Sequence, residues 1–139
     1  MATSTRTVTA YRFPKWGRPH VYSIVLEHFA IDEGFDIPLF HNVFTVLGQV
    51  FSERIEVNLQ RVTFDVFYTT SASTGGPNEA LLSFPDGPAW KGEFLVLRRS
   101  KIHNGYVNLR KGDRTTALAA VFDVIHDFKA HSGQCWDRL

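Results

Sequence analysis

The sequence has only one cysteine, Cys135, and this near absence excludes several classes of small protein. A single thiol cannot form a disulfide within the chain, and it leaves no pair of cysteines for a zinc site. Disulfide scaffolds and cysteine-based zinc modules are therefore excluded. A chain without paired cysteines is typical of a reducing compartment, so we expect an intracellular protein, either cytoplasmic or nuclear.

Long apolar runs are also missing. No stretch approaches the ~18 consecutive apolar residues that indicate a membrane-spanning helix, so we expect no membrane partner. The first residues contain no continuous apolar segment of the secretory kind, so we do not expect secretion. They are rich in Ser and Thr and lack acids, a composition shared by organellar transit segments. We prefer to interpret residues 1–18 as a flexible or loosely docked N-terminal arm.

The chain has no large excess of charge of either sign, because 15 Lys and Arg are balanced by 14 Asp and Glu. Global charge therefore does not favour a nucleic acid or a membrane as partner. The distribution along the chain is uneven. Residues 98–114, called the basic segment below, hold six Lys or Arg and one acid, Asp113, whereas residues 27–36 hold four acids and no Lys or Arg.

The common catalytic motifs are absent from the sequence. There is no glycine-rich phosphate loop (GxGxxG or GxxxxGKS/T), no HExxH metal motif and no GxSxG nucleophile motif. The six histidines show no spacing typical of a metal site. We therefore predict no cofactor, no metal site and no catalytic residues, and we favour a binding protein over an enzyme.

What the sequence does contain is enough apolar material for one compact domain. It has 139 residues, of which 44% are apolar, and both values are ordinary for a single globular domain. We expect residues 19–133 to form this domain, with the N-terminal arm before it and a tail, residues 134–139, after it.

Runs of β-branched and aromatic residues predict the strands of this domain. The expected strands cover residues 20–29, 55–70, 81–84, 93–103 and 106–110. The second of these strands changes the parity of its apolar alternation near Gln60 and Arg61, which we interpret as a β-bulge.

Apolar residues at helical spacing predict two amphipathic helices, over about 36–53 and 113–131. Asp36 and Asp113 are suitable caps for their first turns. Together with the strands, these helices predict an α+β fold: a single antiparallel sheet of about five strands, with both helices packed on one face.

The dipeptide Asn104–Gly105 between two strand-like runs is typical of a two-residue hairpin turn. Such a turn would place Ile102 opposite Val107 and Arg99 opposite Arg110. Strand alternation then predicts which side chains face the core, namely Phe94, Val96, Ile102, Val107 and Leu109. The opposite face would carry Leu95, Leu97 and most side chains of the basic segment.

The main candidate site is this opposite face together with the start of the last helix. Its cations would hold phosphates, its aromatic ring would stack on a base, and the helix start would favour an anion. The residues that we assign to it are Arg98, Arg99, Lys101, His103, Tyr106, Arg110, Lys111 and Arg114. The alternative is a solvated face, or one that is neutralised within the chain by Asp32, Glu33 and Asp36.

A second candidate is an interaction surface made by Trp90, Leu95 and Leu97. Apolar side chains on the basic face indicate that something covers it, either a partner or the N-terminal arm. A module that binds another protein, or a second copy of the chain, would use these residues or an exposed strand edge.

A third hypothesis is a small pocket enzyme, which would need Asp65, Tyr68 or His28 inside a pocket. We expect Asp65 to lie on the outward face of its strand, in contact with water. We therefore favour a small intracellular, non-catalytic domain that binds nucleic acid or another polyanion. A protein-interaction or homodimer module is the first alternative, and the pocket enzyme is the second.

Overall fold

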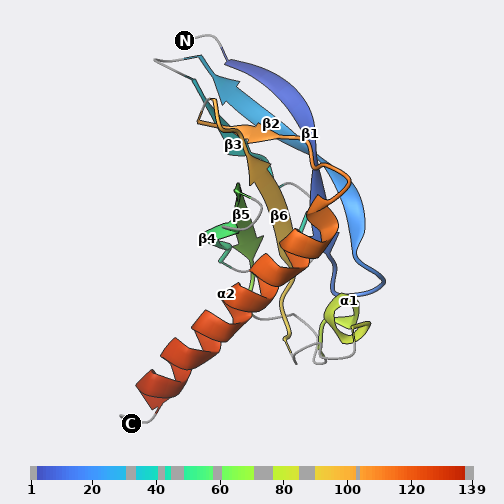
Figure 1. Ribbon diagram of the computed structural model, residues 1–139, viewed down its shortest axis with the longest axis vertical. Coiled ribbons are helices and arrows are strands. Elements are labelled where there is room, and N and C mark those ends of the chain that lie inside the picture. Colours follow the sequence, from blue (N-terminus) through green and yellow to red (C-terminus); the bar gives the residue numbers. More distant parts are fainter. Residues whose placement is uncertain are drawn as a thin grey trace.

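An antiparallel sheet and one long helix make up the fold in the computed structural model (Figure 1). The structure describes residues 3–30, 34–40, 43–44, 49–57, 61–70, 77–84, 90–102 and 104–136. The elements are β1 (Thr3–Phe13), β2 (His20–Phe29), β3 (Phe35–Pro38), β4 (Phe51–Val57), β5 (Val62–Tyr68), α1 (Glu79–Leu82), β6 (Phe94–Arg99), β7 (Tyr106–Val107) and α2 (Asp113–Trp136).

The strands form one curled sheet in the order β3-β2-β1-β6-β5-β4, and β7 pairs with β6. Helix α2 lies across the face of β4, β5 and β6, as Figure 1 shows. The predicted α+β fold with five strands and two helices on one face is therefore wrong. The described part of the chain is mostly β, with seven strands in one sheet and one long helix near the C-terminus.

The N-terminal residues contribute a strand to the middle of the sheet, which corrects the prediction of a loosely docked arm. β1 pairs with β2 along its length, from Thr3 opposite Phe29 to Arg12 opposite His20. Val8 and Ala10 point to one buried face of the sheet, and Phe13 is buried on the other. This burial anchors the chain start. The strand predicted over residues 20–29 is confirmed as β2.

The predicted helix over 36–53 is also wrong. Its first residues belong to β3 and its last residues belong to β4; residues 41–42 and 45–48 lie outside the described part. Phe40 and Phe44 both pack against a buried apolar cluster, as their helical spacing suggested, but neither residue is part of a helix. Because the segment is rich in Phe and Val and holds Pro38, its helix propensity is weak, and tertiary contacts decide the conformation.

Residues 55–70 form parts of two antiparallel strands, and the parity change marks a chain reversal instead of a bulge. Val57 faces Val62 at the end of the β4–β5 pair, and Arg61 adopts a left-handed φ of 52°. The short strand predicted at 81–84 is also corrected, because residues 79–82 form α1. Buried Asn78 caps this helix by accepting a hydrogen bond from the Leu81 amide at 3.1 Å.

The hairpin register is four residues away from the prediction. Arg98 faces Val107 and Arg99 faces Tyr106, and the Ser100 amide donates to the Gly105 carbonyl at 2.8 Å. The connection is therefore a six-residue loop, and Arg99 does not face Arg110. Ile102, predicted in the core, lies in this loop and is 94% exposed.

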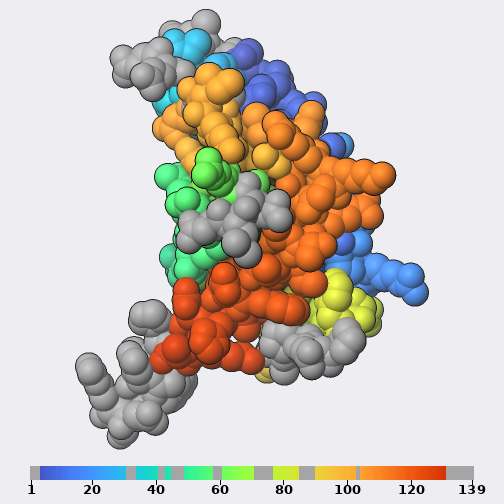
Figure 2. Space-filling model, viewed as in Figure 1, coloured from blue at the N-terminus to red at the C-terminus, as the bar shows by residue number. Residues whose placement is uncertain are grey.

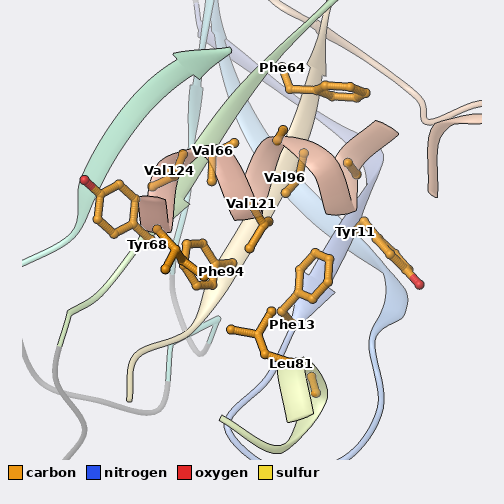
Figure 3. Packing of buried hydrophobic residues seen from close by; sticks show 14 of the residues in the cluster. Tyr11, Phe13, Phe64, Val66, Tyr68, Leu81, Phe94, Val96, Val121 and Val124 are labelled. Atoms are coloured by element: carbon orange, nitrogen blue, oxygen red, sulfur yellow. The ribbon is translucent and has the colours of Figure 1, made fainter. Parts of the chain in front are cut away.

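Two apolar clusters lie on opposite faces of the sheet. The first lies under α2 and includes Phe64, Val96 and Val121, whose packing Figure 3 shows. The second contains Leu26, Leu95 and other residues of β1, β2 and β6. Because both faces of β6 are buried, Leu95 and Leu97 belong to the core. The last predicted helix is confirmed from Asp113, and it continues beyond residue 131 to Trp136.

β1 and β6 form a fork. They pair only over Tyr11–Phe13 of β1, and beyond this point another segment lies between them. This wedge segment, residues 106–109, pairs with β6 through β7. On its other side, Thr9 donates its amide to the Asn108 side chain and accepts from the Leu109 amide. The wedge segment thus brings the basic segment into the sheet.

Candidate functional site

Arg98 of the predicted site is a structural residue. Its side chain is only 9% exposed, and Nη1 donates to both carboxylate oxygens of Asp113, at 2.8 and 2.9 Å. Asp113 also accepts from the Arg110 amide at 2.7 Å. This buried ion pair joins the start of α2 to β6, so the guanidinium of Arg98 is already engaged.

A second buried carboxylate, that of Asp65, engages two more residues of the predicted site. Arg99 donates to Asp65 Oδ2 at 2.8 Å and the Tyr106 hydroxyl donates to the same oxygen at 2.7 Å. Arg54 donates from Nε to Oδ1 at 3.0 Å. The expectation that Asp65 faces outward into water is therefore wrong, because the residue is 7% exposed and fully hydrogen-bonded.

Tyr106 is not available for stacking on a base. It is 5% exposed and packs in the second apolar cluster, with the guanidinium carbon of Arg99 5.6 Å from its ring centre. Burial raises the pKa of the Tyr106 hydroxyl far above its ordinary value, and the hydrogen bond to Asp65 raises it further. The hydroxyl therefore stays protonated and serves as a fixed donor to Asp65.

The three residues predicted to form an interaction surface, Trp90, Leu95 and Leu97, are buried. Trp90 is 5% exposed, and both leucines are fully buried. Trp90 packs under α2, where its ring centre is 5.2 Å from that of Phe128, and its indole N–H donates to the Thr69 carbonyl. All three side chains are covered within the protein, Trp90 in the cluster under α2 and the two leucines in the second apolar cluster on the opposite face of the sheet.

Four cations of the predicted site remain on the surface: Lys101, Arg110, Lys111 and Arg114, together called the basic rim. None of the four has an acidic side-chain partner within the part of the chain that the structure describes. Figure 2 shows the surrounding segment, in amber and orange, as a strip across one face of the molecule. His103, the remaining residue of the prediction, lies outside the described residues.

Two hollows adjoin the loop between β6 and β7. One, of about 570 Å³, is lined by Arg54, Glu56, Thr63 and residues 99–101. The other, of about 280 Å³, is lined by residues 98–102, Val107 and Arg110. Both are lined by Arg99, Ser100 and Lys101. Charged and hydroxyl side chains line the larger hollow, which suits a charged ligand better than an apolar one, whereas Ile102 and Val107 add apolar surface to the smaller hollow.

A third ionic cluster, which sequence reasoning did not assign, surrounds the buried carboxylate of Asp36. Arg6 donates to it, His28 Nδ1 lies 2.7 Å from Oδ1, and the Tyr106 amide donates to Oδ2 at 3.0 Å. Arg6 also donates to the Tyr106 carbonyl. The cluster ties β1, β2 and β3 to the wedge segment.

One sequence feature did point to this cluster: the acids of residues 27–36, which under one alternative would neutralise the basic segment. Asp36 does contact that segment, but it does so through the backbone of Tyr106 and leaves the basic rim unneutralised. Asp32 and Glu33 lie outside the described residues.

The Asp36 cluster predicts a specific loss of stability in acid. Burial of the carboxyl acts to raise its pKa, but the hydrogen bonds and the charge of Arg6 outweigh burial and lower the pKa from 3.8 to about 2. A lowered folded-state pKa contributes stability above pH 3.8, and this contribution is lost as the pH falls to about 2. We expect about 1–2 kcal/mol from this source.

Urea unfolding of the protein and of Asp36→Asn between pH 2 and pH 6 measures this contribution. The variant should be less stable at pH 6, and the difference from the unmodified protein should shrink toward pH 2, because only the aspartate loses its charge. An equal difference at every pH would contradict the assignment.

Comparisons with protein-family models, curated proteins and solved structures find no match for this chain. Of the helices in the described residues, none has the length and apolar character needed to cross a membrane.

Proposed function

We propose that this protein is a binding domain for the phosphate backbone of nucleic acid, and that the basic rim is its contact surface. The observation that carries the proposal is the set of four exposed cations with no acidic partner in the described structure, two of which, Lys101 and Arg110, line the hollows beside the loop between β6 and β7. Exposed cations that are grouped on one side attract a polyanion, because each contact with a phosphate releases counterions.

The buried ion pairs support this division of roles within the basic segment. Arg98 and Arg99 are neutralised by Asp113 and Asp65, so they hold the backbone in place beneath the rim. The rim cations are then presented from a sheet loop and from the start of α2, both of which are anchored. Rigid presentation lowers the entropy cost of binding.

The same geometry favours binding without strong sequence preference. Contacts to phosphates position a protein on nucleic acid but do not read the bases. Tyr106 is buried, so the aromatic ring that the prediction assigned to base stacking is not part of the surface. We therefore expect similar affinities for strands of different sequence.

The pocket-enzyme hypothesis receives less support from its candidate residues. Asp65 already accepts hydrogen bonds from three side chains, which suits a structural carboxylate better than a general base. Tyr68 is buried in the cluster under α2, and His28 is bonded to Asp36. The binding proposal is therefore the one that the geometry supports best.

Fluorescence anisotropy with labelled single-stranded RNA and DNA tests the proposal. If four phosphates are contacted, log Kd should rise against log salt with a slope of about 3, at ~0.7 per phosphate on a single strand. We expect Lys101→Glu/Arg110→Glu to weaken binding by at least about tenfold and to lower the slope by about 1.4.

The matched control is Lys91→Glu/Lys129→Glu, which changes the net charge equally at two exposed lysines outside the basic rim. This control should bind nearly as well as the unmodified protein. Charge reversal at Arg99 is unsuitable, because it would leave Asp65 beside a like charge and disturb the fold. No binding at low salt, or an equal loss in the control, would contradict the proposal.

A further inference from the structure

β4 is the last strand of the sheet order, and Figure 1 shows it at the margin of the sheet. In the described residues its only strand neighbour is β5. A seven-residue strand at the edge of a sheet offers its outward backbone groups to another strand. The charges along β4 indicate which strand would fit.

Pairing with the same strand of a second copy is antiparallel about a two-fold axis, and the residue at the axis faces itself. An axis at Glu53, Arg54 or Glu56 places like charges opposite each other, which destabilises a pair. An axis at Ile55 instead places Arg54 opposite Glu56 of the second copy, and this pair occurs twice. This register alone among those centred within β4 matches opposite charges.

The side chains of this register are available for the contact. Arg54 is 61% exposed, and only its Nε is engaged with Asp65, so other N–H groups of its guanidinium can reach a second carboxylate. Glu56 is exposed and has no cationic side-chain partner within the described residues. Ile55 is half-buried beside the first apolar cluster, so two copies of it would meet at the axis.

Charges on an edge strand often serve to prevent pairing, and the pattern in β4 distinguishes the two roles. A protective edge usually carries one sign of charge, or lysines, which repel a second copy. In β4, Arg54 and Glu56 have opposite charges and lie on the same face, two residues apart. A two-fold axis between them places Arg54 of each copy opposite Glu56 of the other copy, so the charges attract across the axis.

We propose that β4 is a homodimer interface, in which two copies of the strand pair antiparallel about Ile55. The two sheets become one continuous sheet with the two-fold axis at its centre. Arg54 and Glu56 also line the larger hollow. The dimer would therefore carry one such hollow from each copy, both on the same face of the sheet and on either side of the axis. The dimer does not depend on the proposed binding of nucleic acid.

Sedimentation equilibrium of the full chain, from low micromolar to several hundred micromolar, tests the proposal. The average mass should rise with concentration from 15.8 kDa toward twice that value. Arg54→Glu and Glu56→Arg each place like charges across the axis, so each should stay monomeric at concentrations where the unmodified protein is dimeric. The double exchange Arg54→Glu/Glu56→Arg should restore the dimer.

The matched control is Asp123→Arg, which makes the same charge change as Glu56→Arg at an exposed position of α2 and should dimerise normally. Glu56→Arg leaves Asp65 untouched, so it keeps the test valid if Arg54→Glu fails to fold. A monomer at every concentration, normal dimerisation of Glu56→Arg, or a folded double exchange that stays monomeric would each overturn the proposal.

Discussion

Replacing Asp65 with alanine is expected to lower the free energy of unfolding by about 4 kcal/mol, because it removes the shared partner of a buried cluster. Arg99, whose side chain is 13% exposed, would lose its carboxylate, and the buried hydroxyl of Tyr106 would lose its acceptor. An unpaired charge and an unpaired hydroxyl in a largely buried site are both costly.

Chemical denaturation of Asp65→Ala beside Asp123→Ala measures this cost. Asp123 is an exposed aspartate on α2, so its replacement should change stability by less than about 0.5 kcal/mol. Similar losses in the two variants would show that water replaces Asp65 as the partner of Arg99 and Tyr106, and would contradict a structural role for Asp65.

Replacing Gly92 with alanine is expected to prevent stable folding. A Cβ atom at this position would lie 1.6 Å from the carbonyl oxygen of Thr69 and 2.3 Å from its carbonyl carbon. Both are backbone atoms that cannot rotate away. Thr69 is also held by Trp90 and by backbone hydrogen bonding with Glu93, so relief requires breaking these contacts.

The expected loss exceeds about 4 kcal/mol, which is a large part of the stability of a small domain. Gly112→Ala is the matched control, because a Cβ there meets no atom within 4 Å. Far-UV circular dichroism and thermal unfolding should show a normal fold for Gly112→Ala and little or no cooperative transition for Gly92→Ala. A native transition in both variants would contradict the close approach of the two segments.

The elements that could be predicted from sequence are those whose local pattern agrees with their tertiary surroundings. β2 has a run of β-branched and aromatic residues after Pro19, and α2 has an apolar stripe that includes Val121 and Ile125. In both segments the favoured conformation also buries the apolar side chains, so local preference and packing lead to the same result.

The errors fall where distant contacts decide between two local conformations. Phe40 and Phe44 have helical spacing, yet they cover a cluster built from β1, β2 and β6. Asn104–Gly105 favours a tight turn, but burial of Tyr106 beside Asp65 selects a register four residues away. No nearby residue carries this information, because the partners are tens of residues distant.

The candidate site shows the same division. The concentration of cations over residues 98–114 is a property of the sequence, and four of them are exposed. Two acids, Asp65 and Asp113, decide which of these cations are neutralised. Asp65 is remote in sequence from the basic segment, whereas Asp113 lies within it. The Arg98–Asp113 pair joins a strand to the next helix, a contact that sequence separation alone does not reveal.

The fork between β1 and β6 makes the order of synthesis important. β1 and β2 are synthesised before β6 and the wedge segment, and they can pair at once as a hairpin. The other edge of β1 must wait for partners about a hundred residues later, since Thr9 bonds with Leu109. Closure over such a distance is slow relative to local pairing. During translation, the open edge of β1 is therefore accessible to chaperones and to neighbouring nascent chains until the wedge segment and β6 are made.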